Sequence, residues 1–173
     1  MKKFIFILLI LMPFIGFPQQ PWSESSPLNY AWKNVGSPGF SAWGVAYVSL
    51  AFNSTGQPYL SYSDEGYGNR ATVMKFDGTS WTNVGNAGFS AGQVDVTSLA
   101  INPNGEPYVA FTDFTNYYKA IVMKFDGSSW VNVGVDGFSA GQVSYTSLAF
   151  SPSGQPYIAY EDFANSEKEL STL

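Results

Sequence analysis

Short runs of apolar and β-branched residues, separated by glycine, proline and aspartate, recur along most of this chain. In one stretch the runs are residues 81–84, 94–101, 107–112 and 120–125. None has the apolar spacing of a helix face, and none reaches the roughly 10–12 residues that a helix favours. Valine, isoleucine, tyrosine and phenylalanine are common in them, as in β-strands. The pattern therefore predicts four short strands, of which 81–84 comes first.

The same pattern occurs three times at a fixed spacing. The motif W-x-N-V-G begins at Trp32, Trp81 and Trp130, which stand 49 residues apart. G-F-S-A, S-L-A-[FI] and G-[QE]-P-Y recur with the same spacing. A period of roughly 20–50 residues indicates a solenoid, a propeller or an array. The sequence units are 32–80, 81–129 and 130–173, and the third is truncated.

Apolar residues occupy both faces of the predicted strands. Tyr108 and Ala110 alternate with Val109 and Phe111. A sheet that neighbours cover on both sides produces this pattern. Four antiparallel strands joined by tight turns are typical of a propeller blade. We therefore predict an all-β, β-propeller-type fold of about three four-stranded antiparallel blades in an incomplete ring.

Tight turns and long connections alternate between the predicted strands. Gly and Pro mark one tight turn, as in 102–105, and Asp-Gly marks the other, as in 77–78. Alternate connections lie at the same end of an up-and-down sheet, so the G-F-S-A segments share one end with the variable loops after Asp64 and Asp113. Variable loops on a rigid scaffold usually carry binding. The candidate ligand-binding residues at that end are Trp43, Tyr67, Arg70, Tyr117 and Tyr118.

The composition excludes several classes of chemistry. The chain has no histidine and no cysteine, so it lacks the usual proton shuttle, a thiolate nucleophile and disulfides. Its formal charge is −5, and charged residues make up 12% of it. A sparse acidic surface offers no basic stripe for phosphate backbones, so we expect no nucleic-acid partner.

The N-terminus predicts export. Lys2 and Lys3 precede an apolar segment, 4–17, which is shorter than the roughly 20 residues of a membrane-spanning helix. We expect a signal peptide over 1–18, a secreted or cell-surface protein, and no membrane span once the leader is removed; an uncleaved short anchor remains the alternative. Residues 19–31 form a lead-in that would supply a closing strand.

Two sets of residues suggest catalysis, and both have a structural interpretation that we favour. Residues 88–92 and 137–141 match G-x-S-x-G, but that nucleophile motif needs a histidine base and a following helix. Asp64, Asp113 and Asp162 recur at one position, where aspartate usually caps a turn through the backbone. Calcium is the other ligand considered for these carboxylates, but no dense D-x-D-x-D loop is present. We predict no catalytic residue, no metal site and no cofactor.

The arrangement F-D-G-x-S-W, S-L-A-[FI], then [QE]-P-Y resembles Kelch and galactose-oxidase propeller repeats, although the Kelch Gly-Gly pair is missing. It is also similar to the repeats of fucose-specific lectins. The Arg and Glu that hold fucose in that family are not matched, because Pro58-Tyr59 and Val73-Met74 occupy the corresponding stretches. The resemblance implies repeat architecture over about 32–168. The tryptophans at the repeated position are expected to pack between blades.

The number of units is smaller than the 4 to 8 blades that propellers generally have. Lys168 aligns with Arg70 and Lys119, but 169–173 departs from the repeat, so the strand that should follow is expected to be lost. Either the chain is a piece of a longer propeller, which we favour, or several copies assemble as a homo-oligomer.

We therefore expect an exported, non-catalytic module that binds carbohydrate or protein. One alternative is a fragment without independent activity. The other is a carbohydrate-active enzyme that uses the repeated aspartates, because glycosidases work with paired carboxylates.

Overall fold

The structure is a computed structural model that describes residues 33–164 and the backbone of 167–172. One compact unit, Asn34–Leu173, contains all the described strands. The predicted signal peptide, 1–18, and the predicted lead-in, 19–31, lie outside the described residues. In the described part of the chain, no helix is long and apolar enough to cross a membrane.

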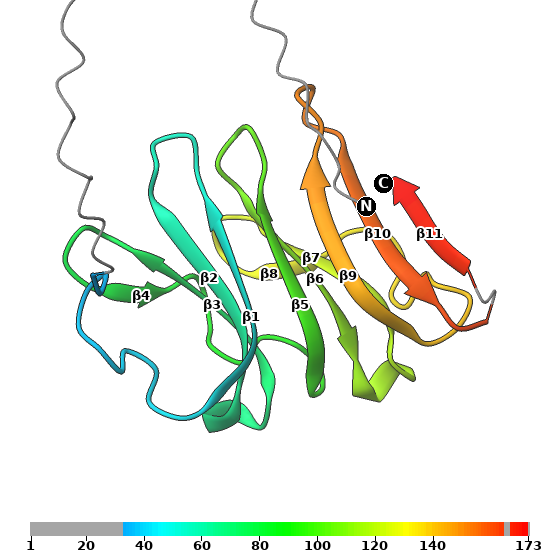
Figure 1. Cartoon of the computed structure of the whole chain (residues 1–173), viewed down its shortest axis with the longest axis horizontal. Helices are drawn as coiled ribbons and strands as arrows, with labels where there is room; N and C mark the ends of the chain where they lie inside the picture. Colours follow the sequence, from blue (N-terminus) through cyan, green and yellow to red (C-terminus); the bar gives the residue numbers. More distant parts are fainter. Residues whose placement is uncertain (1–32, 165–166, 173) are drawn as a thin grey trace, which may run out of the picture. The chain divides into compact units, whose positions relative to one another are not determined.

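The described strands form three antiparallel sheets (Figure 1). The first sheet contains β1 (Val45–Phe52), β2 (Pro58–Asp64), β3 (Arg70–Phe76) and β4 (Trp81–Asn83). The second sheet contains β5 (Val94–Ile101), β6 (Pro107–Asp113), β7 (Lys119–Phe125) and β8 (Trp130–Asn132). The third sheet contains β9 (Val143–Phe150), β10 (Pro156–Asp162) and β11 (Glu167–Thr172). Two 3₁₀ turns, η1 (Glu65–Tyr67) and η2 (Phe114–Asn116), follow β2 and β6. The sheets stack through β1, β5 and β9, which lie side by side, and they do not close into a ring. The predicted all-β, propeller-type fold is confirmed.

The boundaries of the sheets differ from those of the sequence units. We expected residues 81–84 to be the first strand of the sheet that contains 94–125, but β4 pairs with β3, with Phe76 opposite Trp81. The Asp77 turn explains the correction, because its carboxylate accepts hydrogen bonds from the backbone N–H groups of Thr79 and Ser80 at 2.8 Å each. This tight turn returns the chain beside β3. Each tryptophan strand therefore completes the sheet that precedes it.

The strand expected to be lost in the third unit is present. Strand β11 pairs antiparallel with β10, with Glu167 opposite Asp162. Lys119 holds the equivalent place opposite Asp113. The counterpart of Lys119 and Arg70 is therefore Glu167, and the alignment of Lys168 with these two residues is wrong. The connection before β11 is one residue shorter, which shifts the register. Backbone pairing tolerates the polar sequence because β11 is an edge strand.

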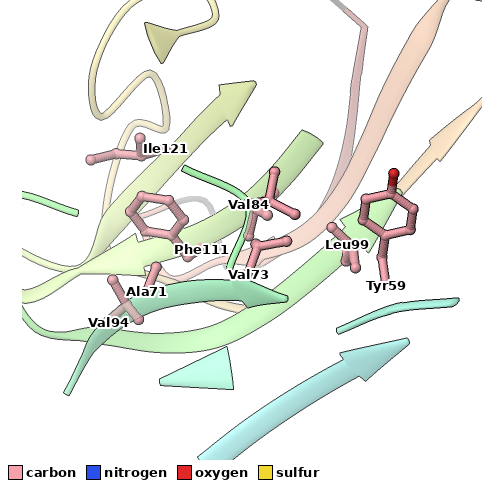
Figure 2. Packing of buried hydrophobic residues seen from close by; sticks show 9 residues of the cluster. Tyr59, Ala71, Val73, Val84, Val94, Leu99, Phe111 and Ile121 are labelled. Carbon is pink, nitrogen blue, oxygen red and sulfur yellow. The ribbon is translucent and has the colours of Figure 1, made fainter. Parts of the chain in front are cut away.

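Two apolar cores join the sheets, and both faces of the middle sheet are covered. Figure 2 shows the first core, in which Val73 and Val84 of the first sheet pack with Leu99 and Phe111 of the second. The second core joins the opposite face of the middle sheet to the third sheet; its members are Ala100, Tyr108, Ala110, Ala120, Val122, Val143, Leu148, Ile158 and Tyr160. This double coverage accounts for the apolar residues on both sides of β6.

Trp130 packs at the first of these junctions, as predicted, whereas Trp81 packs on the segment that enters the first sheet and not between described sheets. Trp130 stacks on Phe89 at 4.2 Å between ring centroids, and Trp81 stacks on Phe40 at 5.1 Å. Each indole N–H donates to a backbone carbonyl, Trp130 to Val84 at 2.8 Å and Trp81 to Val35 at 2.9 Å. Trp32 lies outside the described residues.

The first strand of each sheet contains a bulge with an unusual backbone. Tyr47, Val96 and Tyr145 have positive φ values of 53°, 50° and 53°, a region that side chains other than glycine rarely adopt. The carbonyl of Tyr47 accepts a hydrogen bond from the Thr97 hydroxyl, and that of Val96 accepts one from Thr146 at 2.9 Å. The bulge therefore presents a carbonyl to the next sheet.

Serine side chains make a second bond between consecutive sheets. The Ser49 hydroxyl accepts from the Leu99 N–H at 3.0 Å, and the Ser98 hydroxyl accepts from the Leu148 N–H at 2.9 Å. The two junctions thus use the same apolar and polar contacts, shifted by one repeat.

Candidate functional site

The long connections and the variable loops lie at the same end of the sheets, as their alternation predicted. The Glu65 N–H donates to the Gly44 carbonyl at 3.1 Å, and the Phe114 N–H donates to the Gln93 carbonyl at 2.9 Å. Gly88 has a φ of 61°, and a Cβ placed there would lie 2.6 Å from the Tyr67 Cβ. The absence of a side chain at Gly88 therefore lets Tyr67 cover the connection that enters the second sheet.

The repeated aspartates hold these loops together. Asp113, with 1% of its surface exposed, accepts from the Thr115 N–H at 2.8 Å, the Thr115 hydroxyl at 2.6 Å and the Gly92 N–H at 3.1 Å. Asp162 accepts from the N–H groups of Ala140 at 3.0 Å and Ala164 at 2.9 Å. Asp64 accepts from the Gly66 N–H at 3.1 Å. Their carboxylates are occupied as turn caps, in agreement with the structural interpretation.

The serines of the G-x-S-x-G segments are also structural. Ser90 is buried; its hydroxyl accepts from the Ala71 N–H at 3.0 Å and donates to the Gly92 carbonyl at 2.7 Å. Ser139 makes the same pair of bonds with Ala120 and Gly141. Each hydroxyl therefore ties the loop entering one sheet to the third strand of the sheet before it, and it has no proton acceptor of the kind a nucleophile needs.

A polar cavity lies where the first two sheets meet, between the segment that enters the second sheet and the tight turn that contains Ser129. Its volume is about 370 Å³, and its lining residues are Arg70, Asn86, Ala87, Gly88, Phe89, Ser90, Ser129 and Trp130. Arg70 begins β3 and is the only arginine of the chain. The side chain of Arg70 is exposed and makes no ion pair with any described residue. The cavity therefore combines a guanidinium without an ion-pair partner among the described residues with amide and hydroxyl groups on an aromatic wall.

The structure brings only some of the predicted site residues to this cavity. Arg70 lines it, and Tyr67 contacts its Gly88 wall from an exposed position. Trp43 is exposed and lies against the Gly66 backbone, so it packs beside the loop that carries Tyr67 and does not line the cavity.

Tyr117 and Tyr118 lie in the equivalent loop of the second sheet. Tyr117 is 82% exposed, whereas Tyr118 packs edge to face on Phe114 at 5.0 Å. The Tyr118 carbonyl accepts from the Val143 N–H at 2.9 Å, so this residue helps to join the second and third sheets. These two tyrosines do not line the Arg70 cavity.

Sequence reasoning missed the contribution of Asn86, Ser129 and Trp130. Asn86 stands where the repeat has Ser37 and Val135, and this variation was the available signal. Nothing in the sequence placed Ser129 beside Arg70, because the contact depends on how consecutive sheets stack. Trp130 supplies a wall whose ring already stacks on Phe89.

The tight turns of the first sheet, at the end away from the loops, are a weaker candidate for ligand binding. A cavity of about 310 Å³ lies there between the two tight turns of the first sheet, beside Gln57 and Asp77. The N–H groups of Ser80 and Thr79 hold the pKa of the Asp77 carboxyl below its usual range, and those of Ser129 and Ser128 do the same for Asp126. No cluster of carboxylates in the described residues is arranged to hold a metal ion.

No known family profile matches the chain, and no curated protein matches it. Among solved structures, a thermostable family-43 glycoside hydrolase superposes with a TM-score of 0.53 at 10% identity, covering 80% of this chain and 51% of the hydrolase. A fucose lectin from Kordia zhangzhouensis in complex with methyl-fucoside gives 0.49 at 13%, covering 73% and 91% of the two chains. A protein of unknown function from Dyadobacter fermentans gives 0.47 at 12%, covering 72% and 40%. At these identities the likeness to the hydrolase supports the fold alone.

Proposed function

We propose that this chain is an exported, non-catalytic binding module that recognises carbohydrate at the junction of its first two sheets. The observation that supports the proposal most directly is the 370 Å³ cavity lined by Arg70, which makes no ion pair with a described residue. Ligand sites are concave and place a few convergent polar groups against apolar walls.

Binding is favoured over catalysis because the residues suited to catalysis already have structural partners. The carboxylates of Asp113 and Asp162 cap loops through backbone N–H groups. The Ser90 hydroxyl has both a donor and an acceptor in the protein. Using any of these groups in a reaction would break contacts that hold the loops and connections of the sheets in place.

Carbohydrate fits the chemistry of the cavity. The guanidinium of Arg70 presents several N–H donors in a planar fork, which suits a pair of vicinal hydroxyls or a carboxylate. Asn86 and Ser129 add donors and acceptors on the same wall. The exposed ring of Tyr67 at the rim offers an apolar face with a polar tip, which suits a sugar ring.

The test is calorimetric titration with neutral and uronic-acid oligosaccharides chosen from a glycan array. Hydrogen bonds to a charged group contribute about 1.5–3 kcal/mol, so Arg70→Ala should weaken binding by about 10- to 100-fold. Arg70→Lys should restore part of the affinity, because it keeps the charge and loses the planar fork.

Lys119→Ala is the matched control, since Lys119 holds the place of Arg70 at the second junction. It should leave affinity unchanged, and so should Tyr117→Ala. All variants should unfold at the wild-type temperature, because these side chains are exposed or half-buried. A blank array, or equal losses from Arg70→Ala and Lys119→Ala, would contradict the proposed site.

A further inference from the structure

One apolar face of the first sheet is not packed against any other described sheet. Leu50 is 55% exposed, whereas its counterparts in the next two sheets, Leu99 and Leu148, are 5% and 6% exposed. Val45 and Phe52 are also exposed on this strand, and the counterpart of Val45 in β5 is fully buried. In the second and third sheets this face, which we call the front face, packs against the preceding sheet.

The opposite face of the third sheet, which we call the back face, is not packed against any other described sheet. Ile158 and Tyr160 are buried against the second sheet, while the alternating residues Tyr157 and Ala159 are exposed. The counterpart of Ala159 in the second sheet, Ala110, is fully buried by the sheet that follows it. Within the described part of the chain, the back face of the third sheet therefore lacks the neighbour that the same face has in the other two.

We propose that a second copy of this chain binds here, with the front face of its first sheet packed on the back face of the third sheet. The two surfaces are the two halves of a contact that occurs twice inside the chain. Since the halves differ and stand on opposite ends of one molecule, the association is heterologous and can extend beyond two copies.

The polar groups of the internal junctions are present on the two free faces, with one substitution. The hydroxyl of Ser147 is the third member of the series Ser49 and Ser98, and it is exposed. Its expected donor is the Leu50 N–H of the incoming copy, because Leu99 and Leu148 donate to the earlier serines.

The bulge contact is incomplete. Tyr145 has the same positive φ as Tyr47, so its carbonyl is presented in the same way. On the front face of the first sheet, however, Val48 occupies the position from which Thr97 and Thr146 donate. The contact between copies would thus keep the apolar surface and the serine bond but lose the threonine bond.

Two variants test the geometry by sedimentation velocity and light scattering of the full chain. Leu50→Arg places a charged side chain on the front face of the first sheet, and Ala159→Arg places one on the back face of the third sheet. Both residues are exposed, so the fold is retained. The wild-type chain should form concentration-dependent oligomers, and each variant alone should be monomeric. An equimolar mixture should form a complex of two chains and nothing larger, because each variant contributes one intact face.

Val48→Thr tests the register of the contact. It should tighten association about fivefold, since a hydrogen bond contributes about 1 kcal/mol net. Non-specific hydrophobic association would instead weaken, because the variant removes exposed apolar surface. Val135→Arg, on an exposed loop residue outside both faces, is the matched control and should leave association unchanged.

Three outcomes would overturn the proposal. They are a wild-type chain that stays monomeric at high concentration, a single-face variant that still dimerises alone, and a mixture that stays monomeric. Dimerisation of one variant alone would indicate a symmetric contact through the face left intact. None of these outcomes depends on carbohydrate, so they leave the proposed function to its own test.

Discussion

The indole N–H of Trp130 donates a hydrogen bond to the carbonyl of Val84, which precedes it by 46 residues, at 2.8 Å. The same indole stacks on Phe89 with the two ring planes 9° apart. One side chain therefore holds the start and the middle of the connection between the first and second sheets. Gly85 must lack a side chain for this packing, since a Cβ there would lie 2.7 Å from the Phe125 ring.

Trp130→Phe should lower the free energy of unfolding by about 1–3 kcal/mol, because it leaves the carbonyl of the buried Val84 without the indole donor. Trp81→Phe removes the equivalent bond to Val35, which is exposed to solvent, so its effect should be smaller. Urea denaturation followed by far-UV circular dichroism measures both. Equal losses of unfolding free energy in the two variants would contradict the role assigned to the burial of the carbonyl acceptor.

Ser90→Ala should destabilise the chain by about 1–3 kcal/mol, because the buried Ala71 N–H and Gly92 carbonyl both lose the hydroxyl. Ser139→Ala should have a similar effect through Ala120 and Gly141. Thermal unfolding is the measurement. An ester-hydrolysing activity abolished by Ser90→Ala, with stability intact, would restore the nucleophile interpretation.

Asp113→Asn should destabilise more than Asp64→Asn. The Asp113 carboxylate accepts three hydrogen bonds from buried or half-buried groups, and an amide in its place would turn an N–H donor toward one of them. For Asp113→Asn we expect a loss of about 2–4 kcal/mol, as for other disrupted charge-assisted bonds. The Gly92 amide proton should exchange faster in this variant, which hydrogen exchange can follow. Unchanged exchange at Gly92 would argue against the cap.

Acid should weaken the tight turns of the first two sheets. Backbone N–H groups lower the pKa values of Asp77 and Asp126 in the folded chain, so each carboxylate stabilises the fold above its unfolded pKa of about 3.9. That contribution is lost as the pH falls through the lower, folded pKa. Asp77→Asn with Asp126→Asn should therefore flatten the decline of stability below about pH 4. Carboxyl chemical shifts of the two residues, followed by NMR, should titrate below the usual range.

Alkali should act on the first sheet through Tyr62. Burial, followed by the charges of Asp64 and Tyr67, raises the pKa of Tyr62 to about 12. The neutral phenol therefore stabilises the fold below its unfolded pKa of about 10, and this contribution is lost as the pH rises through the folded value. Tyr62→Phe should make stability less dependent on pH between these values, as measured by urea denaturation. A phenol that ionises near pH 10 would contradict its burial.

The fold was largely predictable because strand pattern and turn chemistry are local signals. The runs of β-branched residues and the Asp-Gly and Pro-Gly turns located the strands within a residue or two. The partner of the short strand at Trp81 was not predictable in this way. Its pairing depends on the Asp77 turn closing back on β3, while the sequence unit begins at the tryptophan.

The candidate site was predictable only in part. The alternation of tight turns and long connections placed Tyr67 and Arg70 at one end of the sheets. It also grouped them with Tyr117 and Tyr118, which lie in the equivalent loop of the second sheet. The cavity joins residues that are about 60 positions apart, Arg70 and Ser129, and that neighbourhood arises from sheet stacking alone.

The offset between sheets and sequence units has a genetic consequence. The first strands of successive sheets start at Val45, Val94 and Val143, and the register within the first two sheets is the same. Deleting or duplicating one 49-residue repeat therefore leaves the order and register of the strands unchanged, whichever position in the repeat the change starts from. Unequal recombination within such a gene changes the number of four-stranded sheets while each of them keeps its closing strand.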